Sequence, residues 1–289
     1  MKIKTFIHFL IDKIYRPFYR KLDVMSADRT LEYIIENKCS VSRYGDGEMG
    51  IIRGYGIKFQ RYDKNLARKL KSIKTTDKVL VCVPSYLSKN VNWDNCSEIE
   101  KKFWKKEKNK FEGWYRKIFS KSHILGDALI SRFYISKVDK SGVKDYIEKI
   151  KKLWENRDII FVEGYNSRLG YGNDLFDNAK SIRRILCPTE NAFALYDNIL
   201  NSVRKNANRN DLVILALGPT ATVLAKDLSE YELQAIDLGH VDIEYEWFKM
   251  NATEKVPIPN KHVNECGSLG ECDQLQLDKE YLNQIVERI

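Results

Sequence analysis

The hexapeptide RYGDGE, residues 43–48, places two carboxylates two positions apart, directly after a short β-prone stretch. In an extended segment residues i and i+2 point to the same side, so Asp46 and Glu48 could aim at one point. The glycines at 45 and 47 allow a tight turn and the close approach of another group. Hard divalent cations such as Mg²⁺ and Mn²⁺ prefer oxygen ligands and are often shared with substrate phosphates. The hexapeptide predicts a metal–diphosphate site; the alternative is a surface turn.

A second candidate site is the loop Gly218-Pro219-Thr220, which leads from a predicted strand into a predicted helix. Free N–H groups at a helix N-terminus bind phosphate through hydrogen bonds and the helix dipole. The loop matches neither the Walker nor the Rossmann fingerprint, and capping of the helix by Thr220 is the simpler alternative. Phosphate contact is favoured because a predicted buried strand precedes the loop.

Two more loops carry polar residues that suit a sugar or phosphate ligand. The loop after Val162 contains Glu163, Arg168 and three glycines, and an acid that ends a buried strand is unusual unless something uses it. A flexible surface loop is the alternative. Glu190 and Asn191 follow another predicted strand, although Asn191 could simply cap the next helix.

The last candidate pair is His240 and Asp242, which again stand at i and i+2 beside a glycine. Histidine is a transition-metal ligand and a proton carrier near neutral pH. A lone histidine is more often structural. This one follows a predicted strand on the same edge as the other polar loops, which favours a functional role.

Apolar runs define the elements that would position these residues. Buried strands are expected at 78–84, 158–164 and 212–218, with weaker strands at 182–187 and 234–238 and helices at 192–205 and 219–228. The alternating order predicts an α/β fold with a Rossmann-like, doubly wound, mostly parallel sheet and helices on both faces. Ligands bind such sheets beyond the carboxyl ends of the strands, so the polar loops are expected on one edge.

Composition excludes several other classes of protein. The 289 residues are 43% apolar, which is typical of a globular protein with a packed core. No apolar run is long enough to suggest a membrane span, and the first residues do not resemble a secretory signal. Six scattered cysteines indicate reduced thiols. A cytoplasmic protein is therefore expected.

The net charge of +9 is concentrated in two segments. Residues 1–21 contain six basic side chains and one acid, with apolar residues at helical spacing. Such a helix could lie on an anionic membrane surface, or its apolar face could dock on the domain or on a second subunit. Residues 101–121 interleave basic and aromatic side chains, which is most simply a helix with one buried face. No nucleic-acid motif is found, and no nucleic-acid partner is expected.

The order of five sequence blocks resembles a bacterial glycosyltransferase family with the GT-D type fold, formerly a conserved domain of unknown function. The blocks are RYGDGE, ISRFYIS, VEGYNSRLGYGNDLFDNAKSIRRILCPTENAF, ALGPTATVLAKDL and AIDLGHVDIEYEW. The resemblance covers about 26–250, leaving a basic amphipathic N-terminal helix at 1–25 and a C-terminal extension at 251–289. It implies a UDP-sugar-dependent hexosyltransferase that uses Mn²⁺ or Mg²⁺ and an Asp-Xaa-Glu motif, which is Asp46-Gly47-Glu48 here.

The resemblance, joined to the residue chemistry, suggests a role for each candidate. Asp46, Glu48 and His240 would be metal ligands, and Glu163 or Asp242 would be the base of an inverting enzyme, although the sequence does not decide between inversion and retention. Donor-binding residues would be Arg43, Gly45, Arg168, Glu190, Asn191, Gly218, Pro219 and Thr220. The acceptor would be a lipid- or protein-linked glycan in surface polysaccharide or glycoprotein synthesis.

Two rival functions remain at the level of sequence. The first is a nucleotide-binding or membrane-associated protein without catalysis, supported by the basic segments. The second is another Rossmann-like transferase, such as a methyltransferase, which would leave the Asp-Gly-Glu element unexplained.

Overall fold

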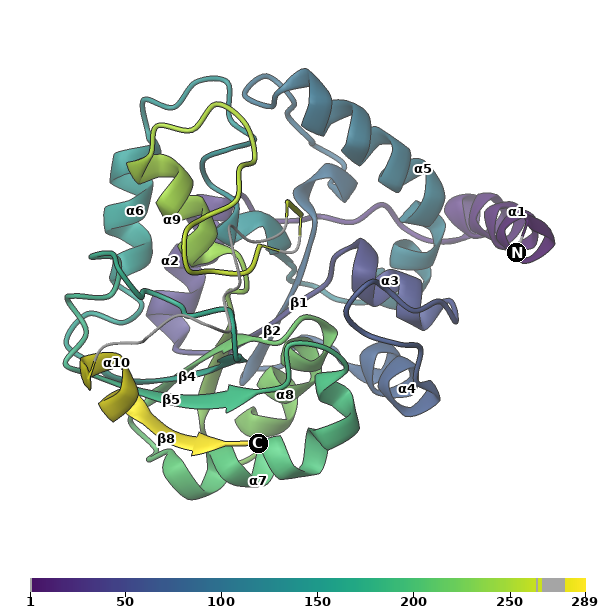
Figure 1. Ribbon diagram of the computed structural model, residues 1–289. Helices are drawn as coiled ribbons and strands as arrows, with labels where there is room; N and C mark the ends of the chain where they lie inside the picture. The colour runs from purple at the N-terminus through teal and green to yellow at the C-terminus, as the bar shows by residue number, and fades with distance from the viewer. Residues whose placement is uncertain (1, 264, 267–278) are drawn as a thin grey trace.

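The computed structural model describes residues 2–263, 265–266 and 279–289, and its centre is a parallel sheet (Figure 1). Within these residues the strand order is β3-β2-β1-β7-β6-β4-β5-β8, and every neighbouring pair is parallel. The strands are β1 (Ser40–Arg43), β2 (Val79–Val83), β3 (Gly126–Asp127), β4 (Asp158–Gly164), β5 (Ser181–Cys187), β6 (Leu212–Ala216), β7 (Gln234–Asp237) and β8 (Ile285–Arg288). The predicted α/β class is confirmed.

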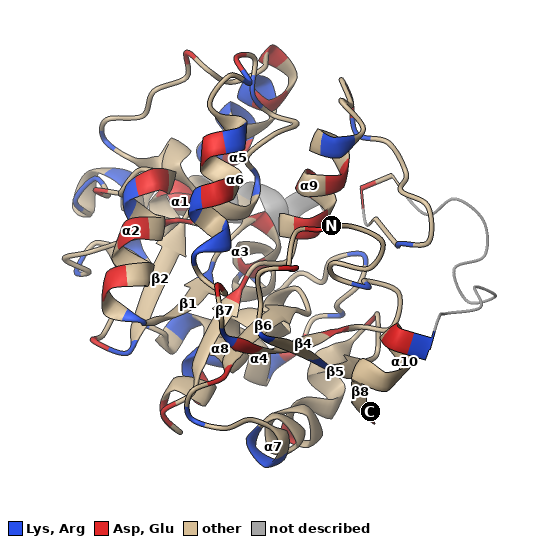
Figure 2. Cartoon of the chain, turned by 90° about the vertical axis from the view of Figure 1, so that its left-hand side faces the viewer, with Lys and Arg blue, Asp and Glu red and all other residues tan. Residues whose placement is uncertain are grey.

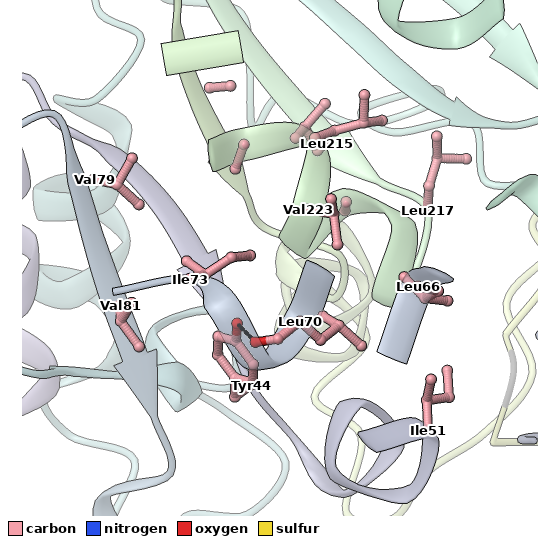
Figure 3. Packing of buried hydrophobic residues seen from close by; sticks show 14 of the residues in the cluster. Tyr44, Ile51, Leu66, Leu70, Ile73, Val79, Val81, Leu215, Leu217 and Val223 are labelled. Carbon is pink, nitrogen blue, oxygen red and sulfur yellow. Dashed lines mark hydrogen bonds between the residues drawn. The ribbon is translucent and has the colours of Figure 1, made fainter. Parts of the chain in front are cut away.

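Side chains of the central strands alternate between two apolar cores, one on each face of the sheet. In β2, Val79, Val81 and Val83 belong to the first core, whereas Leu80 and Cys82 belong to the second. Successive side chains of a strand point to opposite faces, so a strand covered on both sides needs a continuous apolar run. Figure 3 shows part of the first core, where side chains from the sheet meet side chains from helices.

Helices cover both faces, as a doubly wound sheet requires (Figure 1). The second core is closed by α2 (Ala27–Asn37), α6 (Val143–Lys151) and α9 (Val241–Lys249). The first core is closed by α3 (Asp46–Ile52), α4 (Lys64–Ser72), α5 (Glu98–Phe119), α7 (Tyr196–Asn206) and α8 (Pro219–Ser229). The short helices are η1 (Ser85–Leu87), η2 (Ala128–Ser131), η3 (Ala192–Leu195) and α10 (Lys279–Gln284). Many charged side chains lie on the helices, for example α2, α5 and α6 (Figure 2).

The chain leaves β1 and β7 in opposite directions across the sheet, because β1 leads to β2 on one side and β7 leads to β8 on the other. These strands are neighbours, with Val41 opposite Ile236, although most of the chain separates them in sequence. β2 and β3 extend the sheet on one side of this point, and β6, β4, β5 and β8 extend it on the other. Loops diverge at such a switch point and leave a crevice at the carboxyl ends of the strands.

The five strands expected from apolar runs are all present, as β2, β4, β5, β6 and β7. The helices expected at 192–205 and 219–228 correspond to α7, preceded by η3, and to α8. The expected extension at 251–289 contains a strand that sequence analysis did not foresee. β8 pairs with β5 in the same sheet, and its residues alternate between half-buried and exposed, so it carries no long apolar run.

The N-terminal helix α1 (Lys2–Phe18) packs beside α5 at the edge of the molecule (Figure 1). Its buried Asp12 accepts hydrogen bonds from the N–H groups of Gly113 and Trp114, at 2.8 and 3.2 Å, and pairs with Arg16 at 2.9 Å. A Cβ at Gly113 would lie 2.1 Å from the Asp12 carbonyl oxygen, so the close contact requires glycine. The hydrogen bonds of Asp12, which we call the polar anchor, therefore hold α1 on α5.

The apolar stripe of α1 remains open to solvent. It consists of Ile7, Leu10, Ile14 and Phe18, which are 44–77% exposed. The helix itself packs against α5, and the expected apolar face includes Phe6 and Phe9, whose side chains lie outside the described ones, so docking of this face on the domain, on a second subunit or on a membrane stays a prediction. No helix in the described part of the chain has the length and apolarity needed to cross a membrane.

Candidate active site

A cavity of about 360 Å³ lies at the switch point of the sheet. Its walls include the segments that follow β1, β6 and β7, together with residues 57–59, 262–263 and 265. Among the predicted site residues, the cavity is lined by Arg43, Gly45, Asp46, Glu48, Gly218, His240 and Asp242. The structure thus brings together residues from opposite ends of the chain.

Asp46 and Glu48 belong to the first turn of α3, so the extended geometry expected for them is wrong. Gly45 is the N-cap, and Glu48 Oε2 accepts the Gly45 N–H at 2.6 Å, as in a capping box. The hydroxyl of Tyr115 donates to the Gly45 carbonyl at 2.8 Å and fixes this turn from the other side. Asp46 is exposed and Glu48 is half-buried, and both still face the cavity.

Burial, with smaller contributions from the nearby charges of Asp237 and Asp46, raises the pKa of Glu48 to about 7. The other acids of the cavity each have a basic partner: Asp237 pairs with Arg43, Asp242 with Lys261 and Glu265 with Arg132. No basic side chain in the described residues forms an ion pair with Asp46 or Glu48. The two motif carboxylates are therefore the uncompensated negative charges of the cavity.

Arg43 ties three neighbouring segments together at the cavity floor. One terminal nitrogen donates to Ser131 Oγ at 2.7 Å and to the Ala128 carbonyl at 3.0 Å, and the other pairs with Asp237 at 2.8 Å. Sequence analysis missed Asp237 as a site residue, although it ends a predicted strand as Glu163 does. Asp237 lies beside Arg43 because β1 pairs with β7, and no local sequence pattern predicts that pairing.

His240 contacts Arg132, another residue that sequence analysis quoted without assigning a role. Arg132 lies 3.0 Å from His240 Nε2 and pairs with Glu265 at 2.7 Å. Burial and then the Arg132 charge lower the pKa of His240 to about 3, so the ring is neutral and Nε2 accepts the Arg132 hydrogen bond. Because that nitrogen faces a guanidinium, the predicted role of His240 as a metal ligand gains no support.

Asp242 is fully buried, and both of its oxygens are occupied. Oδ1 accepts hydrogen bonds from the Gly170 N–H at 3.0 Å and from Asn173 at 2.7 Å, and Oδ2 pairs with Lys261 at 2.7 Å. Although Asp242 borders the cavity, this network makes it a structural link between α9 and two loops. A role as base would require a free oxygen.

Glu163 and Arg168 do not line the cavity. Glu163 is fully buried, where it pairs with Arg184 at 2.6 Å and accepts the Leu169 N–H at 2.7 Å. Arg168 is also buried and donates to the Asn260 carbonyl at 2.6 Å. The acid near the end of the buried strand β4 therefore pairs with an arginine of β5, and the proposed roles of Glu163 and Arg168 gain no support from the cavity.

Glu190 and Asn191 also lie outside the cavity, but Asn191 acts on one of its walls. The Asn191 N–H donates to the Phe59 carbonyl at 2.8 Å, and its side-chain oxygen accepts the Arg61 N–H at 2.7 Å. These bonds hold the segment that carries Lys58 and Phe59 over the cavity. Asn191 therefore positions the wall and does not line it.

In the loop before α8, only Gly218 reaches the cavity, whereas Pro219 and Thr220 are buried in the first helical turn. Gly218 has a φ of +52°, and a Cβ there would lie 2.5 Å from the Phe59 ring. A side chain is thus excluded both by the backbone conformation and by the aromatic ring. Thr220 Oγ1 is buried without a hydrogen-bond partner in the described residues, so it does not cap the helix.

The residues fit a hard divalent cation in part. Asp46 and Glu48 supply uncompensated carboxylate oxygens of the kind that Mg²⁺ and Mn²⁺ prefer, and such ions take further ligands from phosphates and water. Within the described residues no group of three or more His, Cys, Asp or Glu side chains is arranged to hold a metal ion. The two carboxylates fit the ion when a diphosphate completes its coordination, and the set with His240 does not form.

The parallel doubly wound sheet with a polar cavity at its switch point defines an α/β protein of the kind that binds ligands at the carboxyl ends of its strands. The model of the glycosyltransferase GT-D fold family matches residues 41–266, which is more than half of the chain. The chain therefore belongs to the GT-D fold glycosyltransferase family.

Two curated relatives come from streptococci. Probable glycosyl transferase Gly of Streptococcus gordonii is 37% identical over 276 residues, covering 94% of this chain and 40% of that protein. Glycosyltransferase GlyD of Streptococcus pneumoniae serotype 4 is 38% identical over 271 residues, covering 93% of this chain and 33% of that protein. The chain thus spans about a third to two fifths of the length of these relatives.

Two solved structures match over nearly the whole chain. One, described as the highly conserved domain of unknown function 1792 with a distinct glycosyltransferase fold, is 40% identical with a TM-score of 0.87, covering 99% of both chains. The other, described as a new glycosyltransferase from Streptococcus sanguinis, is 37% identical with a TM-score of 0.85, covering 93% of this chain and 99% of that chain.

Proposed function

We propose that the protein transfers a hexose from a UDP-sugar to a glycan acceptor, with a divalent metal ion between the donor diphosphate and the carboxylates of Asp46 and Glu48. The acceptor would be lipid- or protein-linked, in the synthesis of a bacterial surface polysaccharide or glycoprotein. The observation that carries the proposal is the pair of uncompensated carboxylates at the switch point, the place where open α/β sheets bind their ligands.

The charge balance of the cavity supports a metal-bound donor. A diphosphate alone would be repelled by Asp46 and Glu48, because no basic side chain neutralises them. A bound cation would remove this repulsion and would stabilise the negative charge that develops on the leaving diphosphate. The pKa of Glu48 is raised mainly by burial and to a smaller extent by the Asp237 and Asp46 charges, so a bound cation would also stabilise the ionised form of Glu48.

The protein's own residues have distinct tasks in this proposal. Arg43 is already oriented by three partners, so it can present a fixed positive charge at the cavity floor without a large loss of side-chain entropy. Lys58 is an exposed basic residue on the opposite wall that could contact phosphate. The ring of Phe59, packed over Gly218, offers an apolar surface for the uracil base.

The test is UDP release from a panel of UDP-sugars with Mn²⁺, Mg²⁺ or EDTA. We expect one donor to be hydrolysed slowly in a metal-dependent manner, and Asp46→Asn to abolish this release. Glu155→Gln is the matched control, because Glu155 is exposed and does not line the cavity, and this variant should behave as wild type. UDP binding without turnover on any donor or acceptor would favour the non-catalytic alternative, and absence of UDP binding would refute both.

We also propose that the protein is cytoplasmic and lies at the inner face of the membrane through the apolar stripe of α1. The exposed side chains Lys13, Arg20 and Lys21 stand beside this stripe, which suits anionic lipid headgroups. Wild-type protein should sediment with vesicles that contain phosphatidylglycerol and not with pure phosphatidylcholine. The double variant Ile14→Ser/Phe18→Ser should remain in solution, whereas a concentration-dependent dimer lost in that variant would assign the stripe to a homodimer.

A further inference from the structure

A second cavity, of about 510 Å³, adjoins the first and shares three of its lining residues, Trp104, Leu129 and Arg132. The neighbouring residues Asp127 and Ala128 line different cavities, Ala128 the first and Asp127 the second. The second cavity therefore opens next to the place where the donor diphosphate and its sugar would lie. None of the residues predicted from sequence for donor or metal binding lines it.

The walls of this cavity are joined at its rim. Asn95 donates to the Asp139 carbonyl at 2.9 Å and accepts the Asp139 N–H at 2.6 Å, and the Ser97 N–H donates to the Ser136 carbonyl at 2.9 Å. These bonds connect the loop before α5 to the loop before α6. The cavity is therefore a built feature of the fold, with a fixed distance between its two sides.

The lining suits a neutral molecule with many hydroxyl groups. Apolar ring surface is offered by Trp93, and hydrogen-bonding groups by Asn92, Ser136 and the acids of the lining. Arg132 is already paired with Glu265, and Lys137 shares the lining with the acids Asp28, Asp127 and Asp139, so the cavity has no excess of positive charge that would favour an anion. A saccharide combines apolar C–H faces with a rim of hydroxyl groups, and ring surfaces with a few convergent polar groups are the usual features of such a binding site.

Asp127 is the most tightly positioned acid of this lining. It ends β3 and is 4% exposed, and its Oδ1 accepts the N–H groups of Ser85 at 3.1 Å and of Leu129 at 2.9 Å. No basic side chain in the described residues forms an ion pair with it. Burial raises its pKa to about 6, which leaves the carboxylate ionised at neutral pH and able to accept a hydrogen bond from a hydroxyl group.

We propose that this second cavity binds the acceptor saccharide and that Asp127 accepts a hydrogen bond from one of its hydroxyl groups. The proposal depends on the proposed glycosyltransferase function, which supplies the reason for a sugar-binding cavity next to the donor cavity. It adds a location for the acceptor, on the β2–β3 side of the switch point, and a residue that orients it.

The experiment compares acceptor-dependent transfer with metal-dependent donor hydrolysis in the same preparation. The probes are p-nitrophenyl glycosides of the common hexoses and N-acetylhexosamines, in both anomers, with the UDP-sugar that wild-type protein hydrolyses. Asp127→Asn retains an oxygen for the two backbone N–H groups and removes the charge. Gly142→Trp adds a ring at the cavity wall, where a new Cβ meets no atom within 4 Å. Lys144→Trp, at an exposed position in the first turn of α6, is the control.

We expect at least one glycoside to increase UDP release, and both cavity variants to lower the ratio of transfer to hydrolysis about tenfold or more, through a higher acceptor KM. The control should keep the wild-type ratio. The proposal is overturned if no glycoside stimulates release, or if both cavity variants keep the wild-type ratio. Absence of donor hydrolysis and of UDP binding in wild-type protein would instead refute the proposed function, and this inference with it.

Discussion

Replacing Glu48 with glutamine should make the metal-free protein more stable at alkaline pH while removing its response to metal. In the folded protein, burial and neighbouring carboxylates raise the pKa of Glu48 from 4.5 to about 7. The folded state therefore holds the Glu48 proton more tightly than the unfolded state does. Stability from this group is fully present below pH 4.5 and is lost as the pH rises through about 7.

The size of this effect follows from the shift in pKa. A rise from 4.5 to about 7 corresponds to about 3 kcal/mol at most, since one pKa unit is worth about 1.4 kcal/mol. Glu48 is partly open to solvent, which reduces the value to about 1–3 kcal/mol. For a chain of this length, that difference raises the melting temperature by about 2–6 °C. Glutamine keeps an acceptor for the Gly45 N–H, so the cap of α3 survives.

The assay is thermal unfolding of wild type and Glu48→Gln at pH 5 and pH 8, each with EDTA or with Mn²⁺. With EDTA, the variant should melt higher than wild type at pH 8 and at nearly the same temperature at pH 5. Mn²⁺ should stabilise wild type at pH 8, by about 2.7 kcal/mol at one hundred times the dissociation constant, and should stabilise the variant much less. Glu155→Gln again serves as the control.

The reasoning would be refuted by a variant that melts lower than wild type at pH 8 in EDTA. That result would mean that the Glu48 carboxylate is stabilised in the folded state, as a capping group that prefers its charged form. If Mn²⁺ raised the melting temperature of both proteins equally, the proposed role of Glu48 in holding the ion would be refuted.

Three further predictions concern residues that shape the site from outside it. Glu163→Gln or Arg184→Met should lower the free energy of unfolding by about 3–5 kcal/mol, because each leaves a buried partner unpaired, and denaturant titration measures this loss. The surviving folded enzyme should retain kcat, whereas a loss of kcat with intact stability would restore Glu163 as a base. Gly218→Ala should raise the donor KM and lower the melting temperature, since its methyl meets the Phe59 ring, and adding Phe59→Ala should partly restore the melting temperature but not the KM; a wild-type melting temperature in Gly218→Ala would contradict the close contact. Gly113→Ala should release α1 to limited trypsin digestion without changing UDP binding, and resistance equal to wild type would count against the polar anchor.

Sequence reasoning succeeded where a single strand or helix determines its own pattern. The runs that became β2 and β6, and the central residues of β4, are apolar because each strand is covered on both faces. β8 has no such run, because it lies at the sheet edge, and it was missed. The start of α3 at Asp46 does have a local signal. Gly45 is the N-cap, and Glu48 stands at the third helical position, which is a capping pattern.

Partners of the site residues were much harder to foresee than the residues themselves. Glu163 and Asp242 drew interest as acids at strand ends, but each is used by a distant basic residue, Arg184 and Lys261 respectively. The contact of His240 with Arg132 joins positions 108 apart in sequence. Such pairings are set by the order of strands in the sheet, and a single sequence carries no local signal for that order.

The pairing of β1 with β7 has a consequence for how the protein comes to be active. Val41 meets Ile236, so the cavity exists only after nearly all of the chain is in place. During synthesis the motif carboxylates emerge early, whereas Asp237, which holds Arg43 at the cavity floor, emerges late. Contacts so distant in sequence must overcome a large loop-closure entropy and form slowly. A nascent chain therefore lacks the proposed donor site until its seventh strand inserts between the first and the sixth.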